Sequence, residues 1–363
     1  MKIDARKVQM VGYSTLSVSL PKDWVKQVGI KPGDIVSMMR LEDGSLKIKP
    51  GLVKEESEKI SKVVHIETCN EAGLLGRIVI ALYLTGADSI ALVGEQGIPR
   101  ERIDEVKGVV DRLNGFSIVE ETPNRMVIQS FIDPASSPIW NLMKRLHSLT
   151  GRMMELMEKA LKEGNAEILR DVREAEEEAD RVYWLSVRQL ILANTRPELQ
   201  EKLGVDNPKY IPGHRMVVKL LEKVGDFAMA ASEDLEAVLK SEVKIGDSDA
   251  GILTKYTEES ISVYNKAFDS WASKDPFKAN SIVDSSNYLE KELRRTAVEV
   301  GNKYSGAGGG SKSGTALAFA IKSYLDNLAQ VVNFSGTIAE AAINHSAIEP
   351  PTLKCRIEST TST

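Results

Sequence analysis

The strongest constraint on the fold is a helical periodicity in residues 215–238, RMVVKLLEKVGDFAMAASEDLEAV. Apolar residues recur there every three or four positions, at Val217, Leu221, Val224, Ala228, Ala231, Leu235 and Val238. This spacing predicts a helix of about seven turns with one stripe facing a core. Glu222 and Asp226 are four residues apart, so they are neighbours on the helix surface, and they lie off that stripe.

A second acidic pair with the same spacing, Glu176 and Asp180, lies in EAEEEADRVYW on the preceding helical segment. Like charges four residues apart on a helix repel by a few tenths of a kcal/mol unless a cation or a basic partner relieves them. A single such pair is compatible with a solvated acidic face. The repeated pairs, together with LEKVGDFAMAASE at residues 221–233, resemble the PhoU-type family of phosphate-uptake regulators, whose helices carry repeated acidic-x-x-x-Asp motifs.

This resemblance implies a multinuclear iron or zinc cluster on the bundle surface, with Glu176, Asp180, Glu222 and Asp226 as candidate metal ligands. Carboxylates are oxygen ligands and suit cations such as Mg²⁺, Mn²⁺ and iron. The expected cofactor is therefore a divalent metal (iron, zinc or magnesium) or an iron cluster. The competing interpretation is an acidic docking surface for a basic partner. The family's usual His after the third-helix Asp is Phe227 here.

Residues 140–344 are almost wholly helical in pattern and form two sets of three helices, each about a hundred residues long. A repeat of this size predicts two like-folded three-helix bundles, at 138–242 and 247–348, instead of one large domain.

Aligning the two sets shows that the second has lost half of the acidic pattern. It retains one acidic residue of each pair, Asp284 and Asp326, whereas Tyr288 and Gln330 replace the following Asp. The family pattern is therefore complete in the first set alone.

The first fifty residues are net basic by four. Their pattern predicts a strand in STLSVSLP, a short helix ended by Gly29, a KPGD turn and a hairpin around Asp43-Gly44. SLPKDWVKQVGIKPGDIV, residues 19–36, resembles the swapped-hairpin DNA-binding domains of the AbrB/SpoVT type.

In that family the fold exists as an intertwined homodimer, in which strands of one copy complete the small β-barrel of the other. About fifty residues with few large apolar side chains would form a marginal core alone. The resemblance implies DNA contacts from Arg6 and Lys7, with Lys22 and Lys26 as weaker backbone contacts. The alternative is that these side chains only solubilise a domain that dimerises the protein.

Residues 60–133 read as a small α/β domain in the order strand, helix, strand, helix, strand, strand. No dinucleotide-binding glycine motif is present, so a scaffold, a dimer contact or a small-molecule sensor all remain open. A charged linker precedes this domain at 52–62, and DPASSP at 133–138 marks its end. The tail, 349–363, is predicted to be disordered. The glycine-rich segment 306–315 lacks the glycine that a P-loop has before its lysine and is interpreted as a connection between helices.

Several classes of protein are disfavoured. No apolar run reaches 18 residues, so no membrane insertion is expected, and MKIDARK lacks the apolar region of a signal peptide, which favours the cytoplasm. Two distant cysteines offer no disulfide framework. A di-iron oxidase needs Glu-x-x-His pairs, but the residues three before the four histidines are Lys62, Lys144, Ile211 and Ala342, so no enzyme is expected.

The sequence therefore predicts a multidomain α+β protein: a swapped-hairpin β-barrel domain (1–51), a small α/β domain (60–133) and two PhoU-like three-helix bundles. The leading interpretation is a cytoplasmic, homodimeric transcription regulator of phosphate uptake that binds operator DNA and senses a metal or a signalling partner. The alternative is an adaptor that binds no DNA and represses a phosphate transporter by contact with its ATPase subunit.

Overall fold

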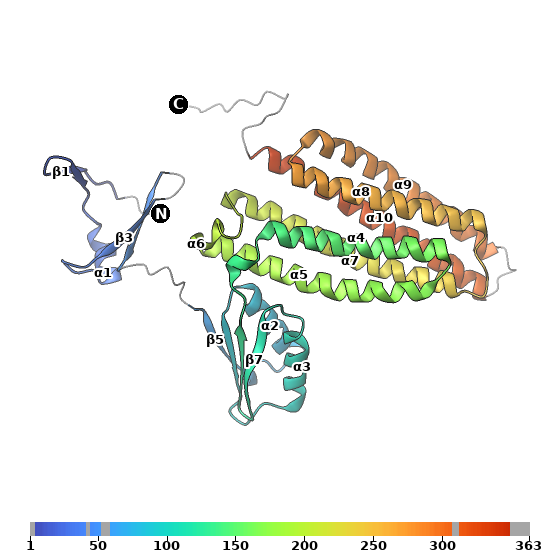
Figure 1. The fold of residues 1–363 in the computed structure, drawn as a ribbon. Helices are drawn as coiled ribbons and strands as arrows, with labels where there is room; N and C mark the ends of the chain where they lie inside the picture. The colour runs from blue at the N-terminus through green and yellow to red at the C-terminus, as the bar shows by residue number, and fades with distance from the viewer. Residues whose placement is uncertain (1–3, 41–43, 52–58, 307–311, 349–363) are drawn as a thin grey trace. The chain divides into compact units, whose positions relative to one another are not determined.

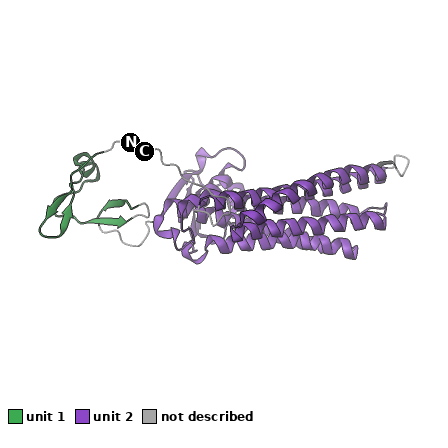
Figure 2. Cartoon of the chain, turned by 90° about the horizontal axis from the view of Figure 1, so that it is seen from above, with its two compact units in different colours: residues 1–59 green, residues 60–363 purple. Residues whose placement is uncertain are grey.

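The computed structural model describes residues 4–40, 44–51, 59–306 and 312–348 (Figure 1). The chain divides into two compact units, residues 1–59 and residues 60–363 (Figure 2). The predicted linker and tail fall largely or wholly outside the described residues.

The first unit consists of two antiparallel hairpins and one short helix. Strand β1 (Gln9–Val11) pairs with β2 (Thr15–Ser17), and β3 (Val36–Arg40) pairs with β4 (Leu46–Pro50); helix α1 (Lys22–Val28) comes between the hairpins in the chain. Gly29 ends α1 in the left-handed conformation, at φ 75°, as the sequence predicts. The predicted second hairpin is confirmed, although Asp43 of its turn lies outside the described residues.

This first unit has no buried core in a single chain. None of its described side chains, from 4–40 and 44–51, is buried. Large apolar side chains are exposed instead, at Val8, Met10, Val11, Tyr13, Leu16, Val18, Ile35, Met38 and Leu46. The two hairpins form separate two-stranded sheets, so the described residues of one copy do not close a barrel.

The α/β domain follows the predicted order: β5 (Ser61–His65), α2 (Leu74–Leu84), β6 (Ser89–Val93), α3 (Arg100–Val110), β7 (Phe116–Thr122) and β8 (Arg125–Ser130). Its strands are arranged β5-β6-β8-β7, with β5 parallel to β6 and the other neighbours antiparallel. Helices α2 and α3 cover one face of the sheet (Figure 1). The domain core contains side chains from β6 and β8, such as Ile90 and Ile128, together with Leu75 of α2 and Val106 of α3.

Six long helices follow, in the predicted two sets of three. The first set is α4 (Ile139–Glu163), α5 (Arg170–Thr195) and α7 (Ile211–Lys240), and the second is α8 (Asp247–Ser273), α9 (Pro276–Gly306) and α10 (Lys312–Ser346). The short helix α6 (Pro197–Gln200) lies in the connection between α5 and α7. All seven apolar residues of the predicted stripe on α7 are buried.

The two sets do not form separate bundles, because their apolar residues join in one core. Helix α10 packs against α7 as well as α9, and α4 packs against α8. Helix α10 buries adjacent residues, including Leu328 with Ala329 and Val331 with Val332, so its apolar face is wide enough for more than one partner helix. The predicted two sets of three helices are thus present, and they pack on each other through a shared core that the sequence repeat does not specify.

The α/β domain packs on the helical region through α2 and α5. Leu84 and Trp184 contact the cores of both parts. Gly86 allows a close approach, because a Cβ atom built there would lie 2.7 Å from Cδ2 of Leu192 on α5. Among the described residues, no helix combines the length and the apolar character that a membrane span requires.

Candidate functional site

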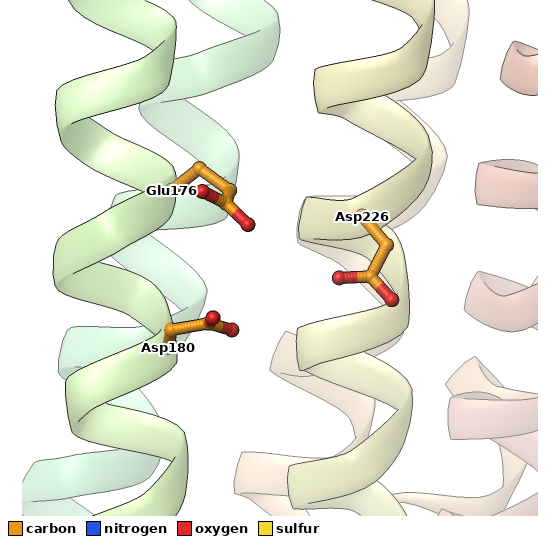
Figure 3. A group of neighbouring side chains, drawn as sticks. All are labelled: Glu176, Asp180 and Asp226. Atoms are coloured by element: carbon orange, nitrogen blue, oxygen red, sulfur yellow. The ribbon is translucent and has the colours of Figure 1, made fainter. Parts of the chain in front are cut away.

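Three of the four predicted metal ligands converge between α5 and α7. Glu176 and Asp180 project from α5 toward Asp226 of α7 (Figure 3). One carboxylate oxygen from each residue lies within 4.8 Å of the other two. We call these three residues the acidic cluster. Two side-by-side helices thus bring together residues that are about fifty positions apart in the sequence.

Glu222, the fourth predicted ligand, is held by lysines of its own helix. The Lys219 ammonium donates to both of its carboxylate oxygens at 2.7 Å, and the Lys223 Nζ lies 3.7 Å from one of them. Lys223 also forms an ion pair with Asp226. The structure therefore gives the acidic cluster two neighbouring cations on α7, in i,i+3 positions.

The acidic cluster is partly buried, and burial together with neighbouring carboxylates raises the pKa of Glu176 and of Asp180. Burial raises the pKa of Glu176, and Asp180 and Asp226 add to that rise. Burial also raises the pKa of Asp180, with further contributions from Glu222 and Asp226, while Arg112 and Lys219 oppose the rise. Crowded carboxylates that resist ionisation together are stabilised by an added positive charge. The acidic cluster between α5 and α7 is therefore electrostatically suited to a cation.

The chemistry of the donors limits which cation fits. The acidic cluster offers carboxylate oxygens and no His or Cys, which matches hard cations such as Mg²⁺ and Mn²⁺ and also iron, and is poor for a structural zinc. Metal–oxygen bonds of about 2.1 Å place opposite ligands about 4.2 Å apart, so oxygens within 4.8 Å can share one ion after small rotamer changes. The residues fit one cation, provided that Lys223 releases Asp226.

The equivalent positions of the second helix set are arranged differently. Asp284 and Tyr288 are exposed on α9. On α10, Asp326 lies 4.0 Å from Arg294, and Arg294 also pairs with Glu290 of its own helix at 2.8 Å. Within the described ranges, this set therefore holds no second group of converging acidic ligands like the acidic cluster.

The four predicted DNA-binding residues lie in two places within the first unit, and all are exposed. Arg6 and Lys7 precede β1, and the Arg6 guanidinium lies 3.0 Å from the Asp4 carboxylate. Lys22 and Lys26 are one turn apart on α1 and line a shallow cavity of about 450 Å³ with apolar neighbours such as Ile30. Nothing in the chain contradicts the predicted contacts, and they stay predictions.

A buried ionic contact between the α/β domain and α5 was missed by sequence reasoning. Asp88 lies 3.1 Å from the Arg196 Nη2 and 3.7 Å from the Arg188 Nη2. Its carboxylate also accepts a hydrogen bond of 2.8 Å from the backbone N–H of Ile60, the first residue of this compact unit. Arg188 is 4% exposed and lies over the ring of Tyr83, with its Cζ 5.0 Å from the centroid. The one available signal was an arginine within the apolar run 182–193.

A single ridge of α5 carries both of these features. Residues four apart are neighbours on a helix surface, and the series Glu176, Asp180, Trp184, Arg188 and Leu192 follows such a ridge as it winds around the helix. The first two belong to the acidic cluster, and the other three contact the α/β domain. The candidate site and the domain junction are therefore continuous along one helix.

The chain joins a net basic hairpin unit, an α/β domain and a helical region in which acidic side chains converge. Residues 9–56 match the family described as antidote-toxin recognition MazE, bacterial antitoxin, which is AbrB-like. Residues 143–235 match the PhoU domain and span the first helix set, including all four acidic positions. The chain thus combines an AbrB-like N-terminal segment with a PhoU domain.

The AbrB-like segment points to a DNA-binding regulator, and the PhoU domain points to regulation of phosphate homeostasis. No curated protein matches the chain, and no solved structure matches it.

Proposed function

We propose that this protein is a homodimeric transcription regulator of phosphate uptake. Its N-terminal unit would bind operator DNA, and its PhoU domain would sense a divalent cation or a signalling partner. The observation that carries this proposal is the presence on one chain of a basic AbrB-like unit and a PhoU domain whose acidic residues converge.

Dimerisation is supported by the apolar surface of the first unit. Both hairpins expose large side chains, including Met10 and Leu16 on the first and Met38 and Leu46 on the second. A segment this short gains little from burial within itself, whereas strands from a second copy would cover these side chains. A second copy completing the core is therefore the arrangement that the exposed residues favour.

DNA contact would come from Arg6, Lys7, Lys22 and Lys26. Arginine and lysine side chains that contact phosphates position a protein on the duplex without reading its sequence. A dimer would present each of these residues twice, so the binding should depend steeply on salt concentration.

Cation binding would use the acidic cluster, with Glu222 joining it once Lys219 and Lys223 move away. A bound cation supplies positive charge that holds the two helices together at this level. Glu176 and Asp180 would bind it from α5 and Asp226 from α7. A cation or partner that binds one arrangement of the helical region better than another would shift the protein toward that arrangement, and so change how the two basic units meet DNA.

The test is binding of the full-length protein to the DNA upstream of its own gene, measured by fluorescence anisotropy over a range of salt concentrations. The logarithm of the wild-type association constant should fall linearly with the logarithm of the salt concentration. The double variant Arg6→Gln/Lys7→Gln should lower that slope by about 0.9 for each phosphate that the variant no longer neutralises. Lys202→Gln, which removes an exposed lysine of the helical region, is the matched control and should leave the slope unchanged.

Absence of DNA binding by the wild-type protein at low salt would overturn the transcription-regulator proposal. It would favour the second candidate, an adaptor that represses a phosphate transporter through its ATPase subunit and uses the N-terminal unit only to dimerise. The PhoU domain match and the acidic surface on the first helix set support that candidate equally.

A further inference from the structure

Arg112 of the α/β domain lies beside the acidic cluster of the helical region. It is two residues beyond the end of α3, and its Cζ lies 5.5 Å from the centroid of the Trp184 ring on α5. Its Nε donates a hydrogen bond of 3.2 Å to the carbonyl oxygen of Gly108, which fixes the direction of the side chain. Trp184 is one helical turn from Asp180, so α3 brings a cation to this end of the cluster.

Arg112 faces the cluster without a direct contact, because it lies over Trp184, one helical turn from Asp180. Among the described residues, Arg112 forms no ion pair with Asp180, so its guanidinium acts over a longer distance. The other cations near the cluster, Arg173, Lys219 and Lys223, belong to α5 and α7 themselves. Arg112 differs from them because it belongs to another domain.

We propose that Arg112 couples cation binding at the acidic cluster to the docking of the α/β domain on α5. This inference rests on the cation binding proposed above. A divalent cation held by Asp180 would repel the guanidinium and weaken the contact of Arg112 with Trp184. By linkage, docking of the α/β domain through Arg112 weakens cation binding by the same factor. The α/β domain is therefore more firmly docked in the cation-free protein than in the cation-bound protein.

This coupling would reach Ile60, the first residue of the second compact unit. Ile60 begins the α/β domain, and its backbone N–H and carbonyl both bond to Asp88 or its neighbour Ser89. Asp88 in turn contacts Arg188 of α5 and Arg196, the residue that follows the end of α5. A change in the docking of the α/β domain is therefore expected to alter the contacts of Asp88, and through them the position of Ile60.

The first test is titration of the full-length protein with Mn²⁺ by isothermal calorimetry at constant ionic strength. Arg112→Gln should tighten Mn²⁺ binding by about five- to tenfold, and Arg112→Glu should tighten it further, because a repelling charge is removed or reversed. Arg112→Lys keeps the charge and should bind like the wild type. Arg100→Gln makes the same charge change at the exposed start of α3 and is the matched control.

The second test is hydrogen–deuterium exchange of residues 107–113 with and without Mn²⁺. Mn²⁺ should increase exchange there in the wild type and leave it unchanged in Arg112→Gln. Equal Mn²⁺ affinities for the wild type and Arg112→Gln, or exchange that Mn²⁺ does not alter, would overturn the coupling while the cation site stands. A wild type that binds no Mn²⁺ would instead overturn the proposed cation site, and the coupling with it.

Discussion

The two helix sets share one core, yet they treat their acidic residues in opposite ways. Between α5 and α7, carboxylates from both helices point toward one another (Figure 3). Between α9 and α10, the aligned positions are exposed or face an arginine, as Asp326 faces Arg294. Packing of the shared core therefore does not determine whether the acidic side chains at these positions converge. The first set keeps several carboxylates close together, and their mutual repulsion costs stability unless a ligand offsets it.

The first set also carries the α/β domain, which packs on it through α2 and α5. Asp88, Arg188 and Trp184 join that domain to α5 beside the acidic cluster. The outer side chains of α9 include exposed Tyr288 and Val298. If the proposed cation site exists, the comparison places it in the first set, beside the α/β domain, and not in the second.

The largest expected effect is on cation binding. Asp180→Asn/Asp226→Asn should weaken Mn²⁺ binding by about a hundredfold or more. Each substitution removes a ligand and a charge, and each loss should weaken the affinity by about tenfold or more. Asp284→Asn/Asp326→Asn, the matched double variant of the second set, should change the affinity less than about twofold. Isothermal calorimetry measures both. Equal losses of affinity in the two double variants would break the comparison between the sets.

The next effect is on stability at the domain junction. Asp88→Ala leaves the nearly buried Arg188 and Arg196 without their carboxylate, and should lower the free energy of unfolding by about 3–5 kcal/mol. Arg294→Met removes an exposed pair on α9 and should cost less than about 1 kcal/mol. Urea denaturation measures both changes. A small loss of stability for Asp88→Ala would show that the junction does not depend on this carboxylate.

The smallest effect is on the stability of the cation-free protein, which matched substitutions in the two sets should change in opposite directions. Asp180→Asn should stabilise the protein at pH 7 by a few tenths of a kcal/mol, because it removes repulsion from like charges. Asp326→Asn should destabilise it by a similar amount, because it removes the attraction of Arg294. Stabilisation by both substitutions, or by neither, would contradict this difference.

The pH dependence of Asp180→Asn follows from the raised pKa of Asp180. The folded protein holds the Asp180 proton more tightly than the unfolded chain, so ionised Asp180 destabilises the fold at pH 7. As the pH falls through the folded-state pKa, this destabilisation disappears in the wild type. The advantage of Asp180→Asn in urea denaturation should therefore shrink on acidification and be absent below the unfolded-state pKa.

Local patterns predicted most of the elements correctly. The stripe from Val217 to Val238 is buried as its spacing requires, and the order of the α/β domain is as expected. The acidic positions on α5 and α7 could be paired in advance, because two helices joined by a connection tend to pack side by side. The ion pairs of Lys219 and Lys223 could also be predicted from the sequence, since their partners are three residues away on the same helix.

The remaining features depend on interactions between distant parts of the chain. Asp88 meets residues that lie about a hundred positions later, and no local pattern marks such a partnership. The merging of the two helix sets into one core depends on how α7 and α10 meet, which a repeat in sequence does not specify. The barrel of the first unit is absent from the described residues of a single chain because its apolar side chains have no partner there.

The most direct test of the central claim is anomalous diffraction from crystals of the full-length protein grown with Mn²⁺. The account predicts a manganese peak within bonding distance of Glu176, Asp180 and Asp226, and none at Asp284 or Asp326. A structure with bound manganese elsewhere and none between α5 and α7 would contradict it.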